Sequence, residues 1–255
     1  MWNIILAVMG LLVGGVINVL ADDLPERGRV SRPRCPHCQT PYPLTGWLAL
    51  SRALFHQGKC PTCHKPVHWR GLAVELSTII LFALLPFFIP PTIVLFITAF
   101  FIAVLLLVIV IDLEHRLILH IVTFPVTGIA LLVTFLYGDN QLLRFALAVT
   151  GAIAGFLIFY LFYWLGLKMF GEGALGFGDV TLAMTMGAML GLQHILFALI
   201  IGIVLGGFIS ALLLLTRRSS SRSYLPYGQY LAIGGIIMLI WGNQILDWYI
   251  GPAGQ

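Results

Sequence analysis

Long apolar stretches separated by short polar segments occupy most of the chain. A helix needs about 20 apolar residues to cross a hydrocarbon core of roughly 30 Å, because its backbone polar groups must be paired internally. Eight segments approach this pattern: Trp2 to Leu20, Leu72 to Ile89, Thr92 to Ile111, Leu117 to Leu136, Leu142 to Leu167, Val180 to Leu190, Ile195 to Leu215 and Leu231 to Ile250. The sixth is short and requires residues from its flanks. The pattern predicts an all-α polytopic membrane protein with about eight transmembrane helices.

The composition supports the same fold class. Hydrophobic residues make up 60% of the 255 residues and charged residues only 9%, whereas about 25% of the residues of a soluble domain are charged. No basic residue precedes the first apolar segment, and Asp22 and Asp23 follow it, which favours a retained anchor over a cleavable signal peptide. We expect a first transmembrane helix over residues 1–20, a polar loop domain over 21–71 and a membrane domain of seven helices over 72–255.

Basic residues are distributed unevenly between the loops. With eight spans the loops form two alternating sets; one set holds thirteen of the fourteen Lys and Arg residues, and the other holds Arg144 alone. Loops rich in Lys and Arg face the cytoplasm. The polar loop domain is therefore predicted to be cytoplasmic, with both termini outside. Contact with the lipid bilayer explains the net charge of +4 without a nucleic-acid partner.

All four cysteines lie in the polar loop domain, as two Cys-x-x-Cys motifs. Cys35 and Cys38 form the first, Cys60 and Cys63 the second, and 21 residues separate the motifs. Four thiolates on two tight turns can form a closed tetrahedral site. Two disulfides are the alternative, but disulfides rarely persist in the cytoplasm. We expect a structural Zn²⁺ ion, which would help this polar segment to fold, and a surface or turn role for the neighbouring His64.

Two acidic residues stand at the ends of predicted spans, where ionisable groups are candidate functional sites because they are costly to place in a membrane. Asp112 ends the third span and Asp179 opens the sixth, so the predicted topology places both at the cytoplasmic side. Two carboxylates facing one water would share a single proton. The ionised partner could then draw a proton from the attacking water while the protonated partner donates to a peptide carbonyl and then to the leaving amine.

Three other residues are predicted to support this pair. Gly176 and Gly178 precede Asp179, and residues without side chains allow a tight turn and close approach of a substrate backbone. A Gly-x-Gly sequence can also belong to a nucleotide-binding loop, but here no predicted strand precedes it and an apolar span follows. Glu75, early in the second span, could neutralise a nearby arginine or shape the cytoplasmic opening of the site.

Motifs along nearly the whole chain resemble those of bacterial type IV prepilin peptidases. They are Asn18-Val19-Leu20 with Leu24-Pro25, the two cysteine motifs, Asp112-Leu113-Glu114-His115-Arg116, Gly176-Phe177-Gly178-Asp179 and Leu225-Pro226-Tyr227-Gly228. The chain departs from the family pattern at Leu119-His120, where the family has Pro-Asp, and at Thr181, where the family has Lys.

The resemblance implies a metal-independent aspartyl endopeptidase of the bacterial inner membrane, with Asp112 and Asp179 as its catalytic acids. Its partners would be type IV prepilin and pilin-like (pseudopilin) precursors, from which it would remove a short basic leader at the cytoplasmic face. Many members of this family also methylate the new N-terminus with S-adenosylmethionine, although no separate motif of this chain indicates a site for that cofactor.

Two other classes of function use part of the same pattern. A proton- or cation-coupled transporter could carry ions on the two acids, but it has no need for the cysteine motifs or for the glycines beside Asp179. A non-catalytic zinc-loop membrane scaffold would use the cysteines alone. In that case the acids would be boundary residues, Asp179 capping a helix and Asp112 pairing with Arg116.

Overall fold

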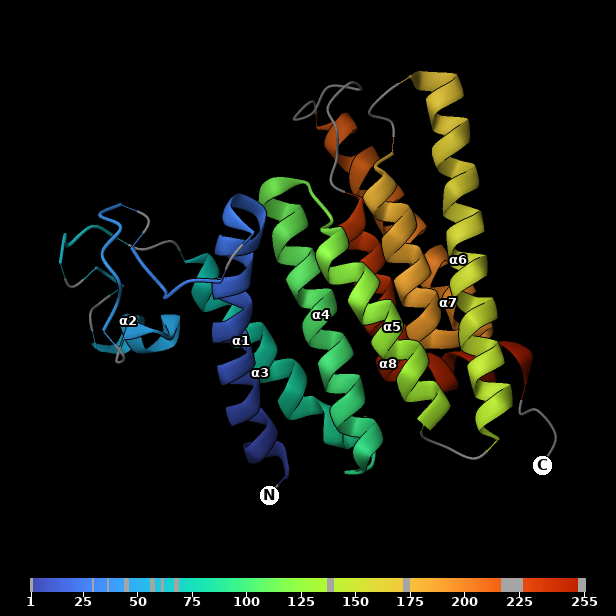
Figure 1. Cartoon of the computed structure of the whole chain (residues 1–255), viewed down its shortest axis with the longest axis horizontal. Helices are drawn as coiled ribbons and strands as arrows, with labels where there is room; N and C mark the ends of the chain where they lie inside the picture. Colours follow the sequence, from blue (N-terminus) through green and yellow to red (C-terminus); the bar gives the residue numbers. More distant parts are fainter. Residues whose placement is uncertain are drawn as a thin grey trace. The chain divides into compact units, whose positions relative to one another are not determined.

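The protein is an assembly of helices. The computed structural model describes residues 2–28, 30–35, 37–43, 46–55, 58–60, 62–66, 69–136, 140–171, 175–216 and 227–251. Its helices are α1 (Trp2–Arg27), α2 (Ala49–Phe55), α3 (Arg70–Phe88), α4 (Ile93–His115), α5 (His120–Leu136), α6 (Gln141–Phe170), α7 (Phe177–Leu215) and α8 (Gly228–Ile250) (Figure 1). Within the described ranges, β pairing is limited to two isolated bridges. The all-α prediction is therefore confirmed.

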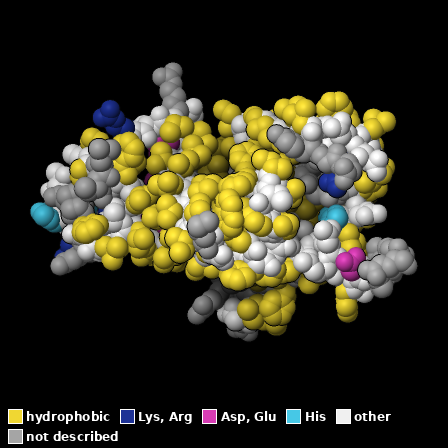
Figure 2. All heavy atoms as spheres, turned by 90° about the horizontal axis from the view of Figure 1, so that it is seen from below, with side chains coloured by type: hydrophobic (Ala, Val, Ile, Leu, Met, Phe, Trp, Pro, Cys, Tyr) yellow, Lys and Arg dark blue, Asp and Glu magenta, His cyan; other side chains and the backbone are white. Residues whose placement is uncertain are grey.

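The longer helices are suited to a membrane. Among the described residues, six helices are long and apolar enough to cross one, namely α1, α3, α4, α6, α7 and α8, and α5 is a shorter apolar helix. Hydrophobic side chains cover most of the face shown in Figure 2. Leu142 and Phe208, for example, expose 78% and 67% of their surface. An apolar surface of this extent would be unfavourable in water, and the chain is a multi-pass membrane protein.

The chain forms two compact units, Met1–Val110 and Ile111–Gln255. In the first unit α1 packs closely along α3. A Cβ atom at Gly10 would lie only 2.6 Å from the carbonyl oxygen of Thr78, so a residue with a side chain would not fit at this contact. α1 continues past the predicted end of the first span at Leu20. Its last turns are polar, and an ion pair of 2.9 Å between Asp23 and Arg27, four residues apart, stabilises them.

In the second unit, α7 consists of two arms that meet at Gly191. This residue has φ 76° and ψ 172°, in the region that favours glycine. A Cβ atom at Gly228, the first residue of α8, would lie 3.3 Å from Asp179 Oδ1, and one at Gly206 would lie 2.8 Å from Tyr227 Cε2. Both arms therefore reach the start of α8, whereas a straight helix would hold Asp179 and Gly206 about 40 Å apart. The reversal separates the segments predicted as the sixth and seventh spans.

Glycines bring the first arm of α7 against α6. A Cβ atom at Gly151 would lie 2.5 Å from the carbonyl oxygen of Gly187, and Cβ atoms at Gly187 and Gly155 would overlap the backbone of the opposite helix. Small residues allow such close helix crossings in membranes. On another side of α7, the hydroxyl groups of Thr127 in α5 and Thr185 lie 2.9 Å apart. These contacts fix the arm that begins with Asp179.

Gly187→Ala is expected to destabilise the protein by about 1–3 kcal/mol, because the added methyl group would overlap the α6 backbone, which no side-chain rotation can relieve. Gly207→Ala is the matched control, since a Cβ atom there meets no atom within 4 Å. The melting temperatures of both variants in detergent micelles would be compared with that of the wild type. Equal melting temperatures for the two variants would contradict the close crossing.

Candidate active site and cysteine cluster

Asp112 is buried near the end of α4, beside the start of α8. Only 3% of its surface is exposed. Its Oδ2 atom accepts a hydrogen bond of 2.9 Å from the N–H of Gln229, and the N–H of Gly228 is a second donor. The first N–H groups of a helix have no partner within the helix, and they carry partial positive charge. The start of α8 therefore satisfies a carboxylate that burial would otherwise leave without water.

Asp179 is the third residue of α7 and is 2% exposed. Its Oδ2 atom accepts a hydrogen bond of 3.1 Å from the N–H of Gly176, and its own N–H donates to the carbonyl oxygen of Gly176 at 3.1 Å. This exchange caps the start of the helix. The capping role considered from the sequence is therefore present. It uses Oδ2, and it leaves Oδ1 to face the second carboxyl group.

The two carboxyl groups meet at Gly228. A Cβ atom at this position would lie 3.2 Å from Asp112 Oδ2 and 3.3 Å from Asp179 Oδ1. The two oxygens are thus separated by no more than the total of these two distances. Because glycine has no side chain, the volume between the carboxyl groups is free of protein atoms from this position. The structure brings together the two acids that the sequence singled out.

Gly228 is the site residue for which sequence reasoning proposed no role. It occurred only as the last residue of the motif that ends Tyr227-Gly228, of which Leu225 and Pro226 lie outside the described residues. The one sequence feature that could have pointed to this residue was a glycine that directly follows an aromatic residue, shortly before the predicted span that begins at Leu231. Its closeness to the acids could not be read from the sequence, because 115 intervening residues separate Asp112 from Gly228.

Ile118, in the segment between α4 and α5, covers the site. A Cβ atom at Gly178 would lie 2.8 Å from Ile118 Cβ, and a Cβ atom at Gly228 would lie 2.6 Å from Ile118 Cδ1. Both glycines are therefore needed for the close approach of this one side chain. Gly178 permits close packing of Ile118, whereas the approach of a substrate backbone to this glycine stays a prediction.

Two residues at which the chain departs from the family pattern, His120 and Thr181, contact each other in the second unit. Thr181 Oγ1 lies 3.3 Å from His120 Nδ1. The imidazole ring also packs edge-on against the ring of Phe177, with centroids 5.9 Å apart. The contact between His120 and Thr181 therefore joins the start of α5 to the first turns of α7.

Tyr227 precedes α8 and adds a donor near Asp179. Burial, together with the neighbouring Asp179 carboxyl group, raises the pKa of Tyr227 to about 12. The phenol consequently remains protonated at neutral pH, and it can donate a hydrogen bond.

Glu75 lies in the first unit, and it is fully buried. Its carboxylate accepts hydrogen bonds of 2.7 Å from the N–H groups of both Ala49 and Leu50, at the start of α2. The side-chain amide of Asn18 donates to Glu75 at 3.4 Å and to the carbonyl oxygen of Gly71 at 2.9 Å. Glu75 therefore ties α2 to α1 and α3, while the two aspartates belong to the second unit.

The four cysteines converge on one point. The Sγ atoms of Cys35, Cys38, Cys60 and Cys63 all lie within 4.8 Å of one another. Cys35 and Cys63 are 3.8 Å apart, as are Cys38 and Cys60. Sulfurs bound tetrahedrally to an ion at about 2.3 Å would be about 3.8 Å apart, whereas a disulfide bond is about 2.0 Å long. All four thiols are free, so the cluster fits a metal ion and not two disulfides.

The two cysteine motifs form turns with the same backbone pattern. The N–H of Gln39 donates to the carbonyl oxygen of Cys35 at 2.9 Å, and that of His64 donates to Cys60 at 3.0 Å. Gln39 and His64 both have positive φ, 58° and 56°. The turn role predicted for His64 is therefore observed. Next to the first turn, the hydroxyl of Thr40, 2.8 Å from the Cys38 sulfur, lowers the pKa of that thiol to about 6, which favours the metal-binding thiolate.

The cluster is linked to α2 by an aromatic residue. The ring of Tyr42 packs against Cys35 and Cys60, and the guanidinium group of Arg52 lies 4.5 Å from the centroid of that ring. Arg52 also donates a hydrogen bond of 2.6 Å to the carbonyl oxygen of Gly46. A continuous set of contacts therefore connects the cysteines to α2, whose start is held by Glu75.

Comparison with known proteins gives a consistent result. Residues 99–211 match the model of the type IV leader peptidase family, and residues 8–89 match the bacterial peptidase A24 N-terminal domain. The chain is 33% identical over 235 residues to the prepilin leader peptidase/N-methyltransferase of Aeromonas hydrophila, covering 90% of this chain and 78% of that protein. It is 28% identical over 254 residues to the protein of the same name from Bacillus subtilis, covering 98% of each.

A third relative with this name, from Pseudomonas aeruginosa, is 28% identical over 284 aligned residues, covering 96% of this chain and 92% of the relative. No solved structure gives a significant match. These similarities favour neither the transporter nor the scaffold considered from the sequence. Given the extent of these matches and the helical membrane fold, the chain belongs to the type IV leader peptidase family.

Proposed function

We propose that this protein is a membrane aspartyl endopeptidase that removes the leader peptide of type IV prepilins and pseudopilins, with Asp112 and Asp179 as its catalytic acids. The observation that carries the proposal is the meeting of two buried carboxyl groups at Gly228. The relatives are prepilin leader peptidases by name, which supports prepilins as the substrate class.

The hydrogen bonds of the two acids suggest how they divide the chemistry. Asp112 accepts hydrogen bonds from two N–H groups at the start of α8, and Asp179 accepts one from Gly176, so we assign the better-stabilised carboxylate, Asp112, as the base. It takes a proton from the water whose oxygen attacks the scissile carbonyl carbon, while Asp179 gives its proton to the carbonyl oxygen. Asp112 then passes its proton to the amide nitrogen, the C–N bond breaks, and a proton of the diol intermediate returns to Asp179.

We assign the polar segment 21–71 as a zinc domain on the cytoplasmic side of the bacterial inner membrane, with both termini on the opposite side. The fourteen Lys and Arg residues and their uneven distribution support this orientation. Cys35, Cys38, Cys60 and Cys63 would hold Zn²⁺. A site closed by four thiolates leaves no position for substrate, so the ion would stabilise the domain and take no part in hydrolysis.

Methylation of the new N-terminus with S-adenosylmethionine is a second candidate activity. The names of the relatives favour it.

Asp112→Asn and Asp179→Asn are each expected to lower the rate of leader cleavage by about a hundredfold or more, because general acid–base catalysis by a positioned group contributes about 10²- to 10⁴-fold. The readout is cleavage of a purified prepilin by the protein in reconstituted membranes. Asp247→Asn, which changes an exposed acid of α8, is the control and should retain full activity. Near-normal cleavage by either dyad variant would reject the proposed chemistry.

Gly228→Ala is expected to abolish cleavage, although it adds only one methyl group. That carbon would lie 2.6 Å from Ile118 Cδ1 and 3.2 and 3.3 Å from the two carboxyl oxygens, so it would displace the side chains that form the site. Gly128→Ala in α5 is the matched control, because a Cβ atom there meets nothing within 4 Å. Both variants would be assayed with the same prepilin after their melting temperatures are measured. Full activity of a folded Gly228→Ala protein would show that the close packing around the two acids is not needed.

Metal analysis of the purified protein is expected to give one zinc per chain, lost in the Cys35→Ser and Cys38→Ser double variant. His64→Asn should keep the zinc, since asparagine tolerates the positive φ of this turn position. Loss of the metal should also speed proteolysis within residues 30–66. Absence of zinc from the wild-type protein prepared without chelators would refute the structural metal site.

A further inference from the structure

A second site lies at the opposite end of the second unit from the two aspartates. A cavity of about 540 Å³ opens where α5 ends, α6 begins and the two arms of α7 meet, with one wall from α8. Gly191, the point of reversal, lines it. This point is twelve residues beyond Asp179, or about 18 Å along the helix. The cavity is therefore separate from the candidate active site.

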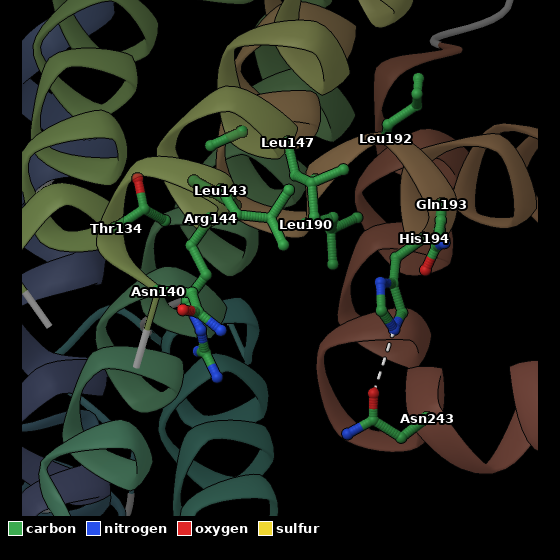
Figure 3. A pocket seen from close by; sticks show the side chains of 13 residues that line it. Thr134, Asn140, Leu143, Arg144, Leu147, Leu190, Leu192, Gln193, His194 and Asn243 are labelled. Carbon is green, nitrogen blue, oxygen red and sulfur yellow. Dashed lines mark hydrogen bonds between the residues drawn. The ribbon is translucent and has the colours of Figure 1, made fainter. Parts of the chain in front are cut away.

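The polar lining of the cavity is suited to an anion. Arg144 and Asn140 extend from one side, and His194 and Asn243 lie on the other (Figure 3). The Nε2–H group of His194 donates to Asn243 Oδ1 at 3.2 Å, which leaves the amide N–H groups of Asn243 available as donors. None of the described residues that line the cavity is acidic. Among the described lining residues, the positive charge of Arg144 thus has no carboxylate counterpart.

The remaining lining is apolar and continues onto the outer surface. Leu143, Leu147 and Leu190 lie between the two polar sides in Figure 3. Leu143 is 59% exposed, and the neighbouring Leu142 is 78% exposed. On α8, Trp248 exposes 85% of its surface, and tryptophan is enriched at the boundary between headgroups and acyl chains. A ligand that fits this lining carries both an anionic group and hydrocarbon.

We propose that this cavity binds the phosphate headgroup of an anionic phospholipid, with Arg144 as the principal contact. The guanidinium group offers paired N–H donors to the phosphate oxygens, Asn140 and Asn243 add neutral donors, and the acyl chains lie along the exposed leucines. The headgroup would lie beside the reversal at Gly191, where non-helical backbone between two predicted spans lines the cavity. The proposal is independent of the peptidase activity, because the site shares no residue with the aspartate pair.

The test is lipid binding to the full-length protein after removal of co-purified lipid, measured by native mass spectrometry in detergent. Phosphatidylglycerol, phosphatidylcholine and inorganic phosphate are the three probes. The wild-type protein is expected to bind one phosphatidylglycerol about tenfold more tightly than phosphatidylcholine, and Arg144→Gln is expected to remove that difference. Lys168→Gln is the matched control, since Lys168 is the basic residue at the other end of the same helix, where it lies over the ring of Trp164.

Arg144→Lys, which keeps the charge but loses the paired donors, should bind with intermediate affinity and provides a second variant if Arg144→Gln does not fold. Unchanged phosphatidylglycerol binding by folded Arg144→Gln would overturn the proposal, as would equal loss in Lys168→Gln. Competition by inorganic phosphate at the same concentration as the lipid would also overturn it, since the acyl chains would then contribute nothing. Leader cleavage is not a readout in this experiment, so its outcome stands apart from that of the peptidase.

Discussion

The candidate active site depends on placing two carboxyl groups side by side in a buried position. Neither can be hydrated there as it would be in water, and each is costly to bury without hydrogen-bond donors. Backbone N–H groups supply those donors, from the start of α8 for Asp112 and from Gly176 for Asp179. Helix starts are the places in a membrane protein where such groups are free. Asp179 therefore lies at the start of α7. Asp112 is near the end of α4, but its carboxyl group lies at the start of α8.

Close backbone approach is the second requirement, and glycine provides it at each stage. Gly151, Gly155 and Gly187 bring α6 against the first arm of α7, and Gly228 allows Ile118 and the two carboxyl groups to approach one point. At Gly191 a positive φ turns α7 back, so that its second arm returns to the start of α8. The same reversal creates the cavity beside Arg144 at the other end. One conformational feature thus shapes both sites of the second unit.

The first unit uses a different form of stabilisation, because its polar segment has little hydrophobic core. Its contacts run from the four cysteines through Tyr42 to Arg52, and from α2 to Glu75. A buried carboxylate that caps α2 is satisfied only while α2 stays in place. The cysteine cluster, through Tyr42 and Arg52, and Glu75, at the start of α2, therefore both hold the polar segment in place.

The sequence by itself determined the long apolar helices, since apolar length and composition act locally, but it did not predict α2 in the polar segment. It also identified the residues whose chemistry is unusual in or beside a membrane. Asp112, Asp179 and the four cysteines were found in this way, and the structure brings each set together. The tertiary structure alone decided the roles of Gly228, Ile118 and Glu75, which depend on neighbours far away along the chain. Glycine and isoleucine have no reactive or ionisable group that would mark them as site residues in a sequence. Their roles become visible only when the packing of distant helices shows which atoms lie next to them.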